Sequence, residues 1–282
     1  MRASINKQYF FIFPFIMVFE QLFKLKWIER KEHAFFLGFI YSIIGLISAK
    51  LIFPANVGLM SIAFTSILLI PSLVMLLKLE ENVEIREKKL SIKRLFEDHK
   101  DIFKVYIYMF LGIFLAYLLT SLLFPEITIQ EIFTTQLRSA GIYGFATIES
   151  IPLFNLIINN LIVFLACFIL SFFYGAGSIL FLTWNASVWG IVFGFFAKQS
   201  LLIEQNKIFS FISLLLPFLP HMVTEALAYI SAAIAGGVVS KAVLREKLFS
   251  KKFYHVTTDA IIFLAIGFIL VILAGIIEVS VF

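Results

Sequence analysis

Long apolar runs, separated by shorter stretches rich in charge, recur along the whole chain. A helix of roughly 20 apolar residues can cross the hydrocarbon core of a bilayer, and seven runs reach or approach that length. The pattern therefore predicts an all-α, polytopic membrane bundle of about seven transmembrane helices. The predicted spans are about 34–53, 57–77, 105–124, 152–174, 178–197, 220–240 and 256–277.

The N-terminal segment, residues 1–33, has a different pattern. Its apolar run, 9–19, is interrupted by Pro14 and is too short to span a bilayer. Charged residues and Trp27 follow the run, which is typical of a helix that lies in the membrane interface. We therefore predict an N-terminal interfacial helix, and a true crossing over 9–28 is the alternative.

Two longer polar stretches connect predicted spans. Residues 78–104 predict a solvated connecting helix with exposed ion pairs four residues apart, and a docking surface for a partner is the alternative. The pairs are Glu84–Lys88, Lys93–Glu97 and Arg94–Asp98. The few apolar residues of the stretch form a stripe on one side of the helix, which we place on the membrane or on neighbouring loops. These residues are Ile85, Ile92, Phe96 and Phe103. Residues 126–151, which contain Gly141 and Gly144, predict a loop.

Composition supports the membrane class. Only 15% of the residues are charged, against roughly 25% in soluble domains, and the mean hydropathy is +1.00. The single cysteine, Cys167, cannot form an internal disulfide. We attribute the formal charge of +5 to the basic residues that set the membrane topology, and we predict no nucleic-acid partner.

The basic residues orient the chain in the membrane. Nineteen of the 23 Lys and Arg residues fall in 1–33, 78–104 and 241–252. Because cytoplasmic loops collect basic residues, this split predicts a multi-pass protein of the plasma membrane with its N-terminus inside and its C-terminus outside. We divide the chain into the interfacial segment 1–33, a membrane hairpin with a charged cytoplasmic helix at 34–104, and a core membrane domain at 105–282.

The sixth predicted span begins with an ionisable pair. His221 and Glu225 lie four residues apart, so a helix brings both side chains to one face. Pro220, just before them, suits the first turn of a helix, where an N–H has no partner. A charged residue inside a bilayer costs several kcal/mol unless it is paired, so this pair marks a candidate functional site.

Asparagines in the neighbouring spans fall at a similar depth. Pro152 opens the fourth span, and Asn159 lies about 10 Å further along at a rise of about 1.5 Å per residue. Asn160 adjoins it, and Asn185 of the fifth span reaches the middle of the bilayer. We therefore predict one polar cluster of His221, Glu225, Asn159, Asn160 and Asn185 in the outer half of the membrane. Hydrogen bonding between helices is the structural alternative for these amides.

Catalytic and metal-binding patterns are weak. The sequence contains no HExxH motif, and His221 with Glu225 could supply two metal ligands but no evident third. We therefore predict a non-enzymatic protein with no metal and no cofactor.

Several of these residues carry a family resemblance. They are Asn159-Asn160, Trp184-Asn185-Ala186, the segment from Leu219 to Glu225, and the Ala-Ile-Ala-Gly-Gly run at 233–237. Over roughly residues 105–280 the chain resembles the stage II sporulation protein M family of multi-pass membrane proteins. Members usually carry glycine where this chain has Ala186 and Met222.

The resemblance implies a non-enzymatic membrane scaffold or anchor for partner proteins. In spore formers, the name-giving member anchors cell-wall-degrading enzymes during engulfment. The alternative function is a transporter, channel or lipid-handling protein that uses the cluster around His221 and Glu225. We predict the lipid bilayer as one partner. The sequence does not identify the protein partners, and it is compatible with a homo-oligomer.

Overall fold

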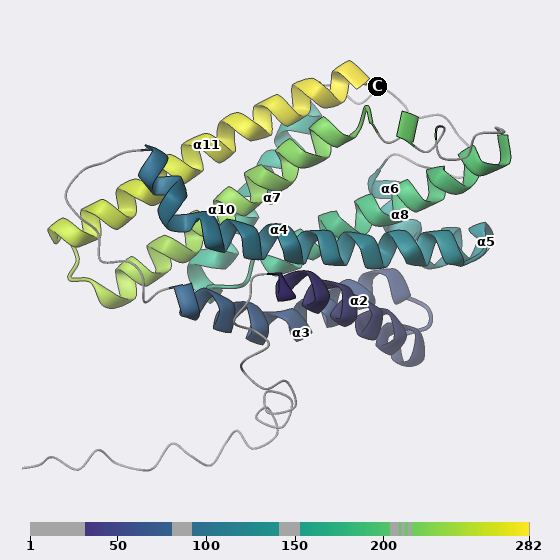
Figure 1. Cartoon of the computed structure of the whole chain (residues 1–282), viewed down its shortest axis with the longest axis horizontal. Helices are drawn as coiled ribbons and strands as arrows, with labels where there is room; N and C mark the ends of the chain where they lie inside the picture. Colours follow the sequence, from purple (N-terminus) through teal and green to yellow (C-terminus); the bar gives the residue numbers. More distant parts are fainter. Residues whose placement is uncertain are drawn as a thin grey trace, which may run out of the picture.

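The computed structural model describes residues 32–80, 92–140, 153–203, 209, 212–213 and 216–281. Within these ranges the secondary structure is helical, and seven helices are long and apolar enough to cross a membrane, which confirms the predicted all-α polytopic bundle (Figure 1). The predicted interfacial helix, the alternative crossing at 9–28 and Pro152 lie outside the described residues. The helices are α2 (His33–Ile52), α3 (Val57–Glu80), α4 (Ile92–Leu123), α5 (Glu126–Ile132), α6 (Thr134–Ser139), α7 (Leu153–Tyr174), α8 (Ile179–Ile203), α10 (Leu219–Arg245) and α11 (Lys251–Val281).

The long helices pack as two groups that lie side by side (Figure 1). In the first group, α4 packs along both α2 and α8, and α3 packs against α2. In the second group, α10 packs along both α7 and α11. Contacts of α8 with α7 and α10 are sparse by comparison. The two groups are therefore less tightly joined to each other than the helices within each group.

The short helices α5 and α6 lie at one end of the bundle, which we call the α5/α6 face. The Gln136 side chain of α6 donates a hydrogen bond to the Gly58 carbonyl at the start of α3, at 3.0 Å. The Lys198 ammonium near the end of α8 donates to the Phe124 carbonyl just after α4. The start of α3 and the ends of α4 and α8 thus lie at the same face. The charge pattern predicts that this face is extracytoplasmic, and that orientation stays a prediction.

Small residues set the distance between paired helices. A Cβ added at Gly190 of α8 would lie 2.7 Å from the Phe114 carbonyl oxygen of α4. Gly194, one turn further, faces Ser121 of α4, and Gly112 of α4 faces the backbone of α2. Membrane helices associate largely through such close packing, because lipid tails are as apolar as their side chains.

In the stretch 78–104, the predicted helical conformation is present from Ile92 onward, but the prediction of a separate connecting helix is wrong there. Residues from Ile92 onward form the first turns of α4, which continues without a break through the third span. The stripe residues Phe96 and Phe103 contact Phe263 of α11, with ring centroids 5.8 and 5.6 Å apart. The stripe therefore packs against another membrane helix, because its apolar face continues the buried face of α4. Residues 81–91 lie outside the described ranges. The predicted domain boundary at 104/105 falls inside α4, and the division into domains stays a prediction.

The loop predicted at 126–151 is also wrong over its first part, where α5 and α6 form. Ile129, Phe133 and Leu137 recur every four residues and are all buried. This spacing gives the two short helices one apolar side, which docks onto the bundle. Residues 141–152 lie outside the described residues.

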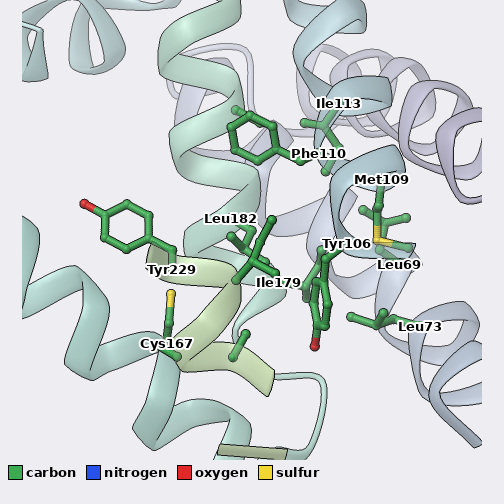
Figure 2. Packing of buried hydrophobic residues seen from close by; sticks show 14 of the residues in the cluster. Leu69, Leu73, Tyr106, Met109, Phe110, Ile113, Cys167, Ile179, Leu182 and Tyr229 are labelled. Atoms are coloured by element: carbon green, nitrogen blue, oxygen red, sulfur yellow. The ribbon is translucent and has the colours of Figure 1, made fainter. Parts of the chain in front are cut away.

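Both helix groups contribute to the buried core, part of which Figure 2 shows. Tyr106 and Met109 of α4, Leu73 of α3, Ile179 of α8 and Tyr229 of α10 all belong to this cluster. Cys167 of α7 is fully buried there as a free thiol. Large side chains thus join the groups at this level of the bundle.

Candidate functional site

A cavity of about 540 Å³ opens between the two helix groups in the half of the bundle nearest the α5/α6 face. Its walls come from the first half of α7, the middle of α8, and the ends of α10 and α11 at that face. The end of α6 contributes Ser139, with Ala140 directly after it. The polar and aromatic lining residues are Ser139, Asn155, Asn159, Asn160, Trp184, Asn185, Trp189, Phe193, Phe196, Phe218, His221, Glu225 and Glu278. The volume falls within the range of small-molecule sites, about 300–1,000 Å³.

His221 is held on both ring nitrogens. Its Nδ1 lies 3.0 Å from the Ala274 carbonyl of α11, and because a carbonyl only accepts, Nδ1 carries a hydrogen. Its Nε2 lies 3.3 Å from a Glu225 carboxylate oxygen and 3.6 Å from a Glu278 carboxylate oxygen. The Trp189 ring of α8 packs edge-on against the imidazole, with centroids 5.3 Å apart. The imidazole is therefore fixed in orientation between two acids.

Glu225 is tied to α7 through a tyrosine. The Tyr229 hydroxyl donates to the second Glu225 oxygen at 2.7 Å, and it lies 3.3 Å from Asn160 Oδ1. Glu225 and Tyr229 are four residues apart on α10, so one helix face carries both. The local sequence thus aligns His221, Glu225 and Tyr229 in successive turns, and packing of α7 on α10 adds Asn160.

All five residues of the predicted cluster line this one cavity, but they differ in the hydrogen-bond contacts that they make. Asn160 is buried and joins Glu225 through Tyr229. Asn159 is exposed in the cavity, and its amide lies 3.5 Å from Asn160 Oδ1. Asn185 donates within α8 to the Phe181 carbonyl at 2.9 Å. The functional role of the five residues stays a prediction.

The local start of α10 follows the predicted pattern. The helix begins at Leu219, so Pro220 lies in its first turn, and Met222 is buried one residue after His221. In the facing helix α8, Ala186 is fully buried. Both positions therefore hold a buried side chain.

The sequence argument missed three residues of the site: Glu278, Tyr229 and Trp189. The predicted seventh span ended at 277, one residue before Glu278, whereas α11 continues to Val281. An acid at the end of a long apolar run was the available signal. The four-residue spacing from Glu225 could have indicated Tyr229. Nothing local marks Trp189, because only the packing of α8 against α10 places it beside His221.

The site has an excess of acid groups. Glu225 and His221 are 7% and 4% exposed, and the Glu278 side chain is 20% exposed. If the imidazole is protonated, it can balance one carboxylate, and the other is still unbalanced. Among the described residues that line the cavity, none is Lys or Arg. Unless a further proton is bound, the cavity carries net negative charge.

Metal coordination does not follow from this arrangement. Across the part of the chain that the structure describes, no group of three His, Cys, Asp or Glu side chains is placed to hold a metal ion. The cluster around His221 is therefore best described as a hydrogen-bonded network that borders a cavity.

Comparison with known protein families gives a match. The sequence model of a family described as Stage II sporulation protein M matches residues 105–281. The chain belongs to this family. The matched region includes α6, α7, α8, α10 and α11, which are the helices that line the cavity. Comparison with curated proteins and with solved structures finds no match. The predicted family is confirmed, and the protein is a membrane protein of the stage II sporulation protein M family.

Proposed function

We propose that this member of the family binds a small polar solute in the cavity and passes it across the plasma membrane, as a multi-pass transporter or channel. The observation that supports the proposal is the position of His221, Glu225 and Glu278, which border an open cavity between two helix groups. Transporters commonly place substrate sites near discontinuous helices between structural units. Here α10 begins within the predicted apolar region, has a proline in its first turn, and presents its ionisable residues directly to the cavity.

A purely structural role explains this arrangement less well. Side chains that only join helices would be expected to pack closely against their partners. Here the two acids and the imidazole border a space of about 540 Å³, and each ionisable group inside a membrane is costly to keep. Intramembrane ionisable groups that face a cavity most often serve an ion or substrate pathway.

Flux from proteoliposomes tests the proposal. Vesicles with the purified full-length protein are loaded with a mixture of small polar solutes, including amines, acids and sugars, and the solutes that leave are identified by mass spectrometry. We expect at least one solute to leave faster than from empty vesicles, and Glu225→Gln to reduce that flux about tenfold, the effect of roughly 1.4 kcal/mol. Glu131→Gln, on the exposed side of α5, is the matched control and should leave the flux unchanged.

Two results would contradict this function. The first is the absence of any protein-dependent flux across the whole mixture. The second is an equal flux from wild type and Glu225→Gln, with both proteins eluting as the same folded species in gel filtration.

A scaffold or anchor for partner proteins is the second candidate, and the family match favours it. A scaffold that holds partners outside the cavity should capture the same proteins in wild type and Glu225→Gln after crosslinking in native membranes. Repeated failure to recover any partner would count against it. We propose no enzymatic step for the chain, and a homo-oligomer stays open.

A further inference from the structure

We infer that the cavity selects a small molecule that carries a primary ammonium group and a hydroxyl group, of the ethanolamine type. The inference rests on the cavity of the proposed function and names the chemistry that it recognises. A free amino alcohol carries both groups, whereas an ethanolamine lipid headgroup carries the ammonium group with its hydroxyl oxygen esterified to phosphate.

The acids define the charge of the ligand. Glu225 and Glu278 both approach the same nitrogen of His221, so one protonated imidazole cannot neutralise both. Glu278 retains 20% exposure of its side chain, and its polar contact among the described residues is the 3.6 Å approach to His221. A carboxylate in this position favours a cation with N–H donors, because charge-assisted hydrogen bonds are short and strong. An anionic ligand would meet repulsion from the same groups.

Aromatic side chains also line the cavity. Trp184, Trp189 and Phe193 of α8 line the cavity, and Phe218 lines it at the start of α10. Trp189 lies beside His221, so an aromatic ring is close to the acid end of the site. An ammonium group is stabilised by the face of an aromatic ring as well as by a carboxylate. The acids and the aromatic rings therefore favour the same class of ligand.

Asn160 supplies an independent observation. The residue is 5% exposed and lines the cavity, and its Nδ2 has no hydrogen-bond partner among the described residues. A buried polar atom without a partner costs about 1–3 kcal/mol, so a ligand that reaches it is favoured. The two ends of an amide are assigned from their contacts, and a hydroxyl group can satisfy either end because it both donates and accepts. A hydroxyl on the ligand therefore matches this position.

Equilibrium binding of radiolabelled ethanolamine to the purified full-length protein in phosphatidylglycerol nanodiscs tests the inference. Ethylene glycol is the neutral competitor of similar size, and choline is the cation without N–H donors. We expect ethanolamine to bind, choline to compete more weakly, and ethylene glycol not to compete. Glu278→Gln should weaken ethanolamine binding by at least about tenfold, and Asn160→Leu should also weaken it. Glu131→Gln should bind as wild type does.

A second set of nanodiscs, which contains phosphatidylethanolamine, separates the two sources of the ligand. If the lipid headgroup occupies the site, these nanodiscs will compete with ethanolamine in wild type but not in Glu278→Gln. If a free amino alcohol is the ligand, the lipid will not compete. The second outcome supports the inference, whereas the first overturns its hydroxyl part, because the lipid headgroup has no free hydroxyl.

The inference is overturned if ethanolamine does not bind. It is also overturned if ethylene glycol competes equally, or if Glu131→Gln weakens binding as much as Glu278→Gln. These results are distinct from failure of the proposed function. Glu225-dependent flux of a solute without an amine would leave the proposed function standing, whereas ethanolamine binding without any flux would remove translocation and leave the inference.

Discussion

Two adjacent glycines on α10, Gly236 and Gly237, should respond in opposite ways to the same substitution. A Cβ added at Gly236 would lie 2.8 Å from the Ser171 Cβ and 2.9 Å from the Phe172 backbone nitrogen of α7. It would come closer still to the Phe168 carbonyl oxygen. Backbone atoms of α7 cannot rotate away, so Gly236→Ala must move the two helices apart.

Gly237 has room for a side chain. The nearest heavy atom to a Cβ added there is the Gly175 carbonyl oxygen at 3.9 Å, which is an ordinary van der Waals distance. Alanine is favoured over glycine in a helix interior by roughly 0.5–1 kcal/mol, and both substitutions share this gain. We therefore expect Gly237→Ala to be neutral or slightly stabilising.

The structure gives the size of the difference. Carbon atoms pack best at about 3.5–4.0 Å, so the 2.8 Å contact at Gly236 requires a separation of at least about 0.7 Å. A gap of about 0.5–1 Å already loses a quarter to a half of each van der Waals contact. Overpacking of this kind costs about 1–3 kcal/mol, so Gly236→Ala should be less stable than Gly237→Ala by about that amount.

Reversible unfolding in mixed micelles, followed by far-ultraviolet circular dichroism during an SDS titration, measures the two free energies of unfolding. Ser171→Gly combined with Gly236→Ala removes one of the opposing atoms and should recover part of the loss. Equal stability of the two single variants would refute the close approach of α7 and α10. A larger loss for Gly237→Ala would refute the rotational position of α10.

Three further predictions concern the cavity and the core. In membranes, an Asn159→Cys variant should react with a membrane-impermeant thiol reagent, and Ile162→Cys, three residues further along on the exposed apolar side of α7, should not. Equal labelling of the two variants would contradict a water-accessible cavity. Phe263→Ala should lower the free energy of unfolding by about 3 kcal/mol because the ring is fully buried against α4, whereas Phe268→Ala, at 45% exposure, should change it little. Tyr229→Phe should cost about 1–3 kcal/mol in the same titration, since a buried Glu225 oxygen loses its donor, and an unchanged midpoint would argue against that hydrogen bond.

Local sequence patterns predicted those features of the protein that depend on one segment at a time. The number of spans follows from the thickness of the bilayer, which any sufficiently long apolar run must match. The shared face of His221 and Glu225 follows from the helical repeat, and Pro220 marks the start of that helix. The asparagines of α7 and α8 were placed at a common depth by counting residues from the span ends.

Tertiary structure decided which faces meet. In water, an apolar stripe shows which side of a helix is buried, but in a membrane the lipid and the protein interior are equally apolar. Phe263 and Phe268 of α11 are therefore indistinguishable in sequence, although one is fully buried and the other is 45% exposed. For the same reason, the contact of Glu278 with His221 and the cavity between α8 and α10 depend on helix packing that no single segment specifies.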